Sequence, residues 1–237
     1  MLVSNFNLKH ISKILLFITL FQFIANSQNY KITYSFSMNI DADTIKNIDR
    51  RNYFKNYFPE HAKNTFGVLW INGKGSFFEQ EGELKSSNYK SNYLGNSFVL
   101  DKKHYRYASQ NIGLNHEFEY KNYTDYNWQI TTESKQINNY KCFKAIGSLK
   151  AINGKSYYFE AWFCPEIPLS YGPDKFAGLP GLIFEVYQKD GKYLHWKLKT
   201  IQKEKVLEIK FPNFSNSLHY EIANKQYYEM FKSILKQ

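Results

Sequence analysis

The sequence is poor in the residues that build metal centres and disulfide-rich miniproteins. Only two of its 237 residues are cysteine, too few for a disulfide framework or for a four-cysteine zinc site. Its six histidines never stand two or four residues apart, so no local metal-binding pair exists. From the sequence we therefore expect neither a metal nor a cofactor.

Short catalytic motifs are also missing. The sequence has no G-x-S-x-G nucleophile elbow and no H-E-x-x-H pair, and the stretch Gly73-Lys74-Gly75-Ser76 lacks the earlier glycine of a phosphate-binding loop. A pair of Cys142 with a histidine would be one nucleophilic arrangement, but we favour a disulfide for this residue, as argued below. We predict no catalytic residues.

Long apolar runs are absent except at the N-terminus. Ile14–Ile24 is an apolar run of eleven residues that follows Lys9, His10 and Lys13 and precedes Ala25-Asn26-Ser27. A basic start, an apolar core and small residues at the cleavage site are typical of a secretory signal peptide. At 1.5 Å per residue the run is much shorter than the roughly 30 Å core of a bilayer. We predict a signal peptide over residues 1–27 and an exported protein, periplasmic or extracellular, that does not span a membrane.

The charge is strongly basic, with a formal net charge of +10. The lysines are scattered among Asn and Tyr and form no dense stripe, which favours a solvated basic surface over a nucleic-acid groove. An exported basic protein meets anionic lipids, polysaccharides and envelope proteins. We therefore expect no nucleic-acid partner.

Aromatic residues are abundant, with 20 Tyr and 20 Phe, and this bias favours β-strands. Residues 30–40 alternate between apolar and polar side chains with period two. Residues 43–58 fit a loose helical stripe, or a long loop, that Pro59 would end, and residues 219–236 have the spacing of a short C-terminal helix.

Three turn signals, at Asn72-Gly73, Asn153-Gly154 and Asp190-Gly191, lie between apolar runs and predict β-hairpins. Consecutive hairpins give an antiparallel sheet. The predicted fold is mainly β: a single antiparallel sheet, strongly curved or an open barrel, with a minor helical insertion at about 43–58 and a short C-terminal helix. No linker divides residues 28–237, so we predict one domain.

Burial on one face selects a three-residue loop at Lys189-Asp190-Gly191. This register predicts three apolar pairs on that face and the pair Glu185 with His195 on the other. The predicted apolar pairs are Leu182 with Leu198, Phe184 with Trp196 and Val186 with Leu194.

The same loop at Ile152-Asn153-Gly154 places Phe143 opposite Phe163 and Cys142 opposite Cys164. Facing residues on antiparallel strands have Cβ atoms about 4.5–5.5 Å apart, close to disulfide reach, and an exported protein meets oxidising conditions. We predict a Cys142–Cys164 disulfide. The alternative is two free thiols, displaced by a bulge in the ladder.

Glu133 and Lys135, and also Glu160, stand among apolar residues on predicted strands. A carboxylate in such a place can be an acid of raised pKa. An exposed edge residue, or one half of a surface ion pair, is the commoner interpretation.

The stretch 165–186 contains three proline turns in close succession. We expect Gly181 to take the positive φ of a type II turn after Pro180, and Gly178 to permit a close backbone approach. A connection that fixes how two hairpins stack is the favoured interpretation. The alternative is a binding rim formed by Gly178, Leu179, Pro180 and Gly181.

The run Phe176-Ala177-Gly178-Leu179-Pro180-Gly181-Leu182-Ile183 resembles the signature of the GLPGLI family of exported Bacteroidetes proteins. Upstream residues of 128–145, together with Ala161-Trp162-Phe163, Glu166-Ile167-Pro168 and Gly172-Pro173, are similar to the same family. The resemblance covers about residues 128–187. It implies a secreted or periplasmic, β-rich protein of unestablished function, and it assigns no catalytic residues that could be carried over.

The first functional hypothesis is an accessory or binding protein of the cell envelope. It would present an aromatic-lined concave sheet to an apolar or extended ligand, such as a lipid or peptide, or to an outer-membrane partner. The alternative is a hydrolase of envelope polymers that uses two of Glu133, Glu160 and Glu185, about 5–10 Å apart in a cleft. A purely structural partner domain is a third possibility.

Overall fold

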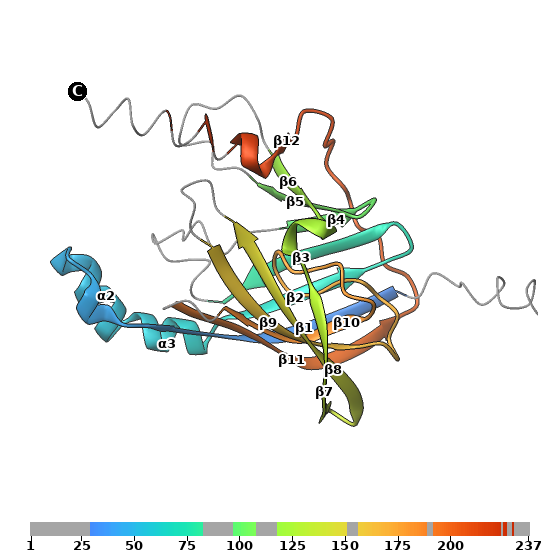
Figure 1. Cartoon of the computed structure of the whole chain (residues 1–237), viewed down its shortest axis with the longest axis horizontal. Coiled ribbons are helices and arrows are strands. Elements are labelled where there is room, and N and C mark those ends of the chain that lie inside the picture. The colour runs from blue at the N-terminus through green and yellow to red at the C-terminus, as the bar shows by residue number, and fades with distance from the viewer. Residues whose placement is uncertain are drawn as a thin grey trace, which may run out of the picture.

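The computed structural model describes residues 29–82, 97–107, 118–150, 156–188, 192–223, 225–226 and 229 (Figure 1). The predicted signal peptide, residues 1–27, lies outside these residues and stays a prediction. Within the described ranges, no helix combines the length and the apolar character needed to cross a bilayer.

Within the described residues, twelve strands form a single unclosed sheet in the order β12-β6-β5-β4-β3-β2-β1-β11-β10-β9-β8-β7 (Figure 1). Every ladder is antiparallel except the short pairing of β12 with β6. The predicted mainly β fold with one antiparallel sheet is confirmed. The strands are β1 (Asn29–Ile40), β2 (Phe66–Ile71), β3 (Gly75–Glu81), β4 (Ser97–Leu100), β5 (Lys103–Tyr107), β6 (Phe118–Asn122), β7 (Gln129–Ile137), β8 (Tyr140–Lys150), β9 (Ser156–Cys164), β10 (Leu182–Gln188), β11 (Lys192–Glu204) and β12 (Leu218–His219).

The first strand lies at the centre of the sheet, between β2 and β11. Its alternation is the one predicted: Ile32, Tyr34 and Phe36 are buried in the main core, whereas Thr33 and Ser35 are only partly covered. Since successive side chains of a strand point to opposite faces, one face of β1 carries the core.

Two of the predicted hairpins allow their registers to be compared with the structure. Phe143 lies opposite Phe163 and Ala145 opposite Ala161, as predicted, although the turn at 151–155 lies outside the described residues. The predicted register of β10 with β11 is wrong by two residues, because Val186 faces Trp196 and Glu185 faces Lys197. A shift of two keeps every side chain on its predicted face, so burial alone does not separate the two registers.

Two further hairpin turns have left-handed residues without glycine. Asp101 and Lys102 join β4 to β5 with φ values of 49° and 60°, and Asn138 and Asn139 join β7 to β8 with 50° and 66°. Two consecutive positive φ values are typical of a type I′ turn, which matches the twist of paired strands.

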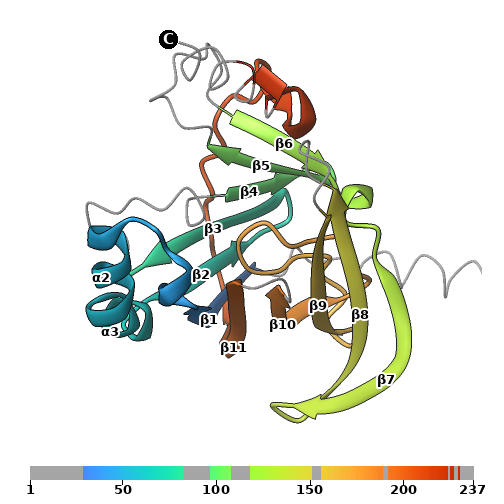
Figure 2. The same cartoon turned by 60° about the vertical axis from the view of Figure 1, so that its left-hand side comes forward.

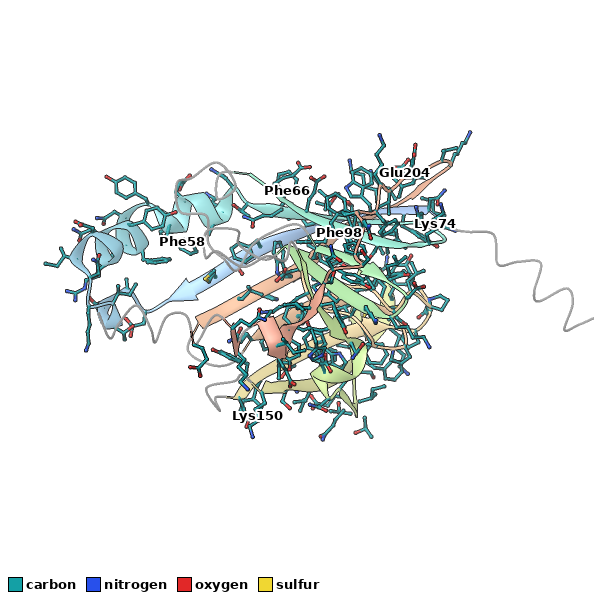
Figure 3. The ribbon with its side chains drawn as sticks, turned by 90° about the horizontal axis from the view of Figure 1, so that it is seen from above. Phe58, Phe66, Lys74, Phe98, Lys150 and Glu204 are labelled. Carbon is teal, nitrogen blue, oxygen red and sulfur yellow. The ribbon has the colours of Figure 1, made fainter. Side chains whose placement is uncertain are left out.

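The helical insertion forms η1 (Ala42–Thr44), α2 (Ile48–Asn56) and α3 (Phe58–Lys63), which extend from one end of the sheet (Figure 1). Figure 3 shows Phe58 on this helical insertion, away from Phe98 in the sheet. Pro59 does not end the helix as expected: it lies in the first turn of α3, where no backbone N–H is needed. A C-terminal helix begins at Tyr220, and most of the predicted range beyond Ala223 lies outside the described residues.

The sheet must curve because its two sides are joined by a short connection. Residues 123–128, which include η3 (Tyr123–Tyr126), run directly from β6 to β7 and span at most about 25 Å. In a flat sheet the ten strand spacings from β6 to β7 would measure about 48 Å. Figure 2 shows the resulting curve, with residues 165–181 inside it.

Candidate functional site

Charged and hydrogen-bonding side chains gather on one face of β7–β11. Neighbouring strands bring them together, because Tyr187 lies opposite Glu160 and Lys144 opposite Trp162. The three carboxylates singled out in the sequence all belong to this group. We call it the charged cluster; its members are Glu133, Lys135, Lys144, Glu160, Trp162, Glu185, Tyr187 and His195.

Glu185 is the anionic centre of one half of the cluster. Its carboxylate is buried, accepts a hydrogen bond from His195 Nε2 at 3.0 Å and pairs with Lys135 Nζ at 2.5 Å. The hydrogen bond from His195, together with the Lys135 ammonium, lowers the pKa of Glu185 to about 2 despite its burial. Glu185 and His195, predicted as a facing pair, are therefore in contact, but diagonally across the ladder.

Glu160 and Glu133 share one cation in the other half. Lys144 Nζ lies 3.1 Å from Glu133 Oε1 and 3.3 Å from Glu160 Oε2. Its hydrogen bond to Glu133 is the main reason that the pKa of Lys144 is raised. Tyr187 donates its hydroxyl hydrogen to Glu160 Oε1, and burial followed by this bond raises the pKa of Tyr187. Each carboxylate of the cluster thus has a partner within the chain.

Trp162 lies beneath the cations of the cluster. Lys135 Nζ is 4.2 Å from the centre of its ring and Lys144 Nζ is 6.0 Å away, which are cation–π distances. The indole is 8% exposed, so the ring is covered and offers little surface on which a sugar or base could stack.

A hydrolase would require one carboxyl group to hold a proton near neutral pH while another is ionised. The structure brings Glu133, Glu160 and Glu185 onto one face, and each is paired there with a lysine or a hydrogen-bond donor of the chain. The arrangement is that of an ion-pair network. No group of three or more His, Cys, Asp or Glu side chains suited to a metal occurs in the part of the chain that the structure describes.

The predicted binding rim lies in the 165–181 segment. Leu179 is buried in the main core, whereas Pro180 is exposed. The positive φ expected at Gly181 occurs at Gly178 instead. Gly178 has the positive φ, at 94°, and a Cβ on Gly181 would lie 2.3 Å from the Cys164 carbonyl oxygen. As a rim for a ligand, Gly178, Leu179, Pro180 and Gly181 stay a prediction.

The curved sheet has two arms, one containing β4 and β5 and the other containing β7–β10. The 165–181 segment crosses the inner side of the sheet and contacts both arms. The Asp174 carbonyl accepts hydrogen bonds from Ser97 Oγ at 2.7 Å and His104 Nε2 at 2.8 Å, on β4 and β5. The Ala177 carbonyl accepts one from Trp128 Nε1 at 3.0 Å. Phe176 is buried in the main core, so the segment fills part of the concave side that the first functional hypothesis reserved for a ligand.

Aromatic side chains also pack on the other side of β3–β6. Phe77, Phe98, Tyr105 and Tyr120 face one another in sequence across four strands. Phe214, from the segment after β11, stacks on Tyr105 with ring centres 3.9 Å apart. Much of the aromatic content that suggested ligand binding is therefore used for internal packing.

The structure does not show the predicted disulfide: Cys142 and Cys164 are buried free thiols next to the end of the ladder of β8 and β9. Burial, and then the neighbouring Cys164, raises the pKa of Cys142 to about 12. Such a thiol is protonated at neutral pH and is a poor nucleophile.

The sequence did not reveal a group of exposed apolar side chains at the β7 end of the sheet. Ile130 on β7, Ile146 on β8 and Tyr158 on β9 are 54%, 42% and 50% exposed. Ile146 and Tyr158 share one face, because Tyr158 is two residues from Glu160, the partner of Ile146. Ile130 lies opposite Ala145 and therefore points to the other face of the sheet. The alternation of polar and apolar residues in β8 and β9 could have indicated that Ile146 and Tyr158 point outward. It could not have indicated that β7 ends the sheet.

Part of the chain matches a known family. Residues 150–185, which include the Gly178–Ile183 run, match a family described as "Protein of unknown function (Porph_ging)". The name GLPGLI, inferred from the residues, is not the name of this match. No curated protein matches the chain.

Among solved structures, two crystal forms of PNGF-II are similar. The C2 form has a TM-score of 0.50 and 17% identity over 87% of this chain, and the P21 form has 0.51 and 16% over 86%. In both, the match covers 33% of the PNGF-II chain, so this chain spans about a third of its length. A LolA superfamily protein, NE2245 from Nitrosomonas europaea, matches at 0.31 and 6% identity, over 77% of this chain and 89% of that one. The PNGF-II likeness shows the fold alone.

Proposed function

We propose that the protein is an exported accessory protein of the cell envelope that binds an extended segment of a partner protein at the β7 edge and has no catalytic machinery of its own. The observation that carries this proposal is the pair of exposed apolar side chains, Ile146 and Tyr158, which share one face of β8 and β9 beside the strand that ends the sheet. Clustered exposed apolar side chains are typical of protein interaction sites.

An edge strand presents backbone N–H and C=O groups along its outer side, and an extended peptide can add to it as a further strand. The register of β7 shifts between Ile130 and Ser134, and such a bulge limits unspecific pairing along the whole edge. The regular stretch from Ser134 to Ile137 supports pairing with a short segment.

The charged cluster supports recognition over catalysis. Because Glu133, Glu160 and Glu185 are already neutralised by partners within the chain, the region offers no unpaired carboxylate to a reacting bond. The 165–181 segment occupies part of the concave side, and this favours a protein partner on the outer edge over a lipid inside the curve.

The proposal can be tested by site-specific photo-cross-linking of the full chain in cells. A photoreactive residue at Tyr158 is expected to give a discrete protein adduct that disappears when Ile146→Asp is introduced. The matched control is a photoreactive residue at Val206, which is 86% exposed but lies outside this group. Equal adducts from both positions, an adduct insensitive to Ile146→Asp, or an adduct with lipid alone would refute the proposed site.

A further inference from the structure

We propose that Cys142 and Cys164 are joined by a disulfide bond in the exported protein, and that this bond forms while the chain folds. The argument starts from the ladder of β8 and β9. The ladder ends with Phe143 facing Phe163, and Cys142 and Cys164, free thiols in the structure, are the next residues beyond that pair. No register shift occurs between these strands from Phe143 to Lys150, so the bulge that would separate the thiols is absent there.

Strands on both sides hold the two thiols in place. Lys135 of β7 lies opposite Cys142, and Leu182 of β10 lies opposite Cys164. Both cysteines are completely buried, and they perturb each other's ionisation, as expected of close neighbours. Facing Cβ atoms are about 4.5–5.5 Å apart on such strands, and a disulfide needs about 3.5–4.5 Å, so a small approach of the strands is enough.

The bond would also anchor the segment that crosses the inner side of the sheet. Cys164 directly precedes residues 165–181, its carbonyl accepts a hydrogen bond from Ile167 N at 3.3 Å, and Gly181 packs against the same carbonyl. A covalent link from Cys164 to β8 would therefore fix the start of that segment at the point where Gly181, its last residue, packs.

The chemistry requires an oxidant of the disulfide class. The two thiols release two protons and two electrons as the S–S bond forms, and the disulfide of the oxidant accepts them and becomes two thiols. In the folded chain the thiols are buried, and the high pKa of Cys142 leaves almost no thiolate to attack the oxidant. Oxidation is therefore expected before burial, during folding in an oxidising compartment.

Mass spectrometry of the exported chain, alkylated in denaturant without reductant, tests the bond. We expect no alkylated cysteine before reduction and two after it. Two alkylated cysteines before reduction would refute the disulfide. The Cys142→Ala/Cys164→Ala variant, with no thiol to alkylate, controls for side reactions.

A second measurement tests when the bond forms. Reduced chain is incubated with glutathione disulfide either during refolding from denaturant or after folding is complete. We expect oxidation to be at least about tenfold faster during refolding, because only the unfolded chain exposes thiols of ordinary pKa. Equal oxidation rates would refute the proposal that the bond forms during folding. The existence of the bond is tested separately by the mass measurement.

Discussion

At the scale of single residues, Glu185 shows how neighbours set the ionisation of a buried group. Its pKa is about 2, below the ordinary 4.5, because His195 and Lys135 favour the carboxylate. A group whose pKa is lower in the folded state stabilises the fold above its unfolded value and loses that contribution as pH falls. We expect the free energy of unfolding to fall by about 3 kcal/mol between pH 4.5 and pH 2 on account of Glu185.

Urea unfolding at several pH values measures this loss. In Glu185→Gln the loss over the same range should be clearly smaller, since the amide does not titrate. Glu133→Gln is the matched control, because Glu133 is 58% exposed in its ion pair with Lys144 and exposed pairs contribute about 0–1 kcal/mol. An identical pH profile for Glu185→Gln and the unchanged chain would contradict the assignment.

At the scale of elements, local turn chemistry revealed the hairpins but not every register. Asn72-Gly73 and Asn153-Gly154 led to the right pairings. The register of β10 with β11 was missed by two residues, because alternation fixes only the face of each side chain and a shift of two leaves the faces unchanged. Glu185 and His195 still meet, since diagonal neighbours on one face remain within reach of long side chains.

The packing of β8 against the start of β7 gives a second prediction. A Cβ on Gly147 would lie 2.5 Å from ring atoms of Trp128, whose Nε1 donates to the Ala177 carbonyl. Gly147→Ala should displace the indole, weaken that hydrogen bond and destabilise the protein by about 1–3 kcal/mol, with a change in tryptophan fluorescence. In a Trp128→Ala background the same substitution should cost much less, because the clashing ring is gone. Equal costs in both backgrounds would contradict the contact as its cause.

At the scale of the whole molecule, the sequence predicted the fold class, the single sheet and the helical insertion, because periodicity and turn residues are local signals. It did not predict that β1 pairs with β11, since a contact between residues more than 150 positions apart leaves no local pattern. The charged cluster was missed for the same reason. Glu133, Glu160 and Glu185 were each noticed, but Lys135, Lys144 and Tyr187 become their partners only when five strands align.

The 165–181 segment holds the curved sheet together across its inner side, and this contact can be weakened selectively. Ser97 and His104 stand on strands five and six positions from β10 in the sheet, yet both donate to the Asp174 carbonyl from buried positions. In the Ser97→Ala/His104→Phe variant the carbonyl loses both donors, at a cost of about 1–3 kcal/mol. Hydrogen exchange should then show lower protection in β4 and β5 than in β8–β10, because the first arm loses its attachment to the segment. The matched control is Ser35→Ala, which removes the side-chain bond to the Lys197 carbonyl at 3.2 Å on the outer side and should leave both arms protected. Equal loss of protection in both arms would mean that the segment contributes to general stability and does not join the two arms.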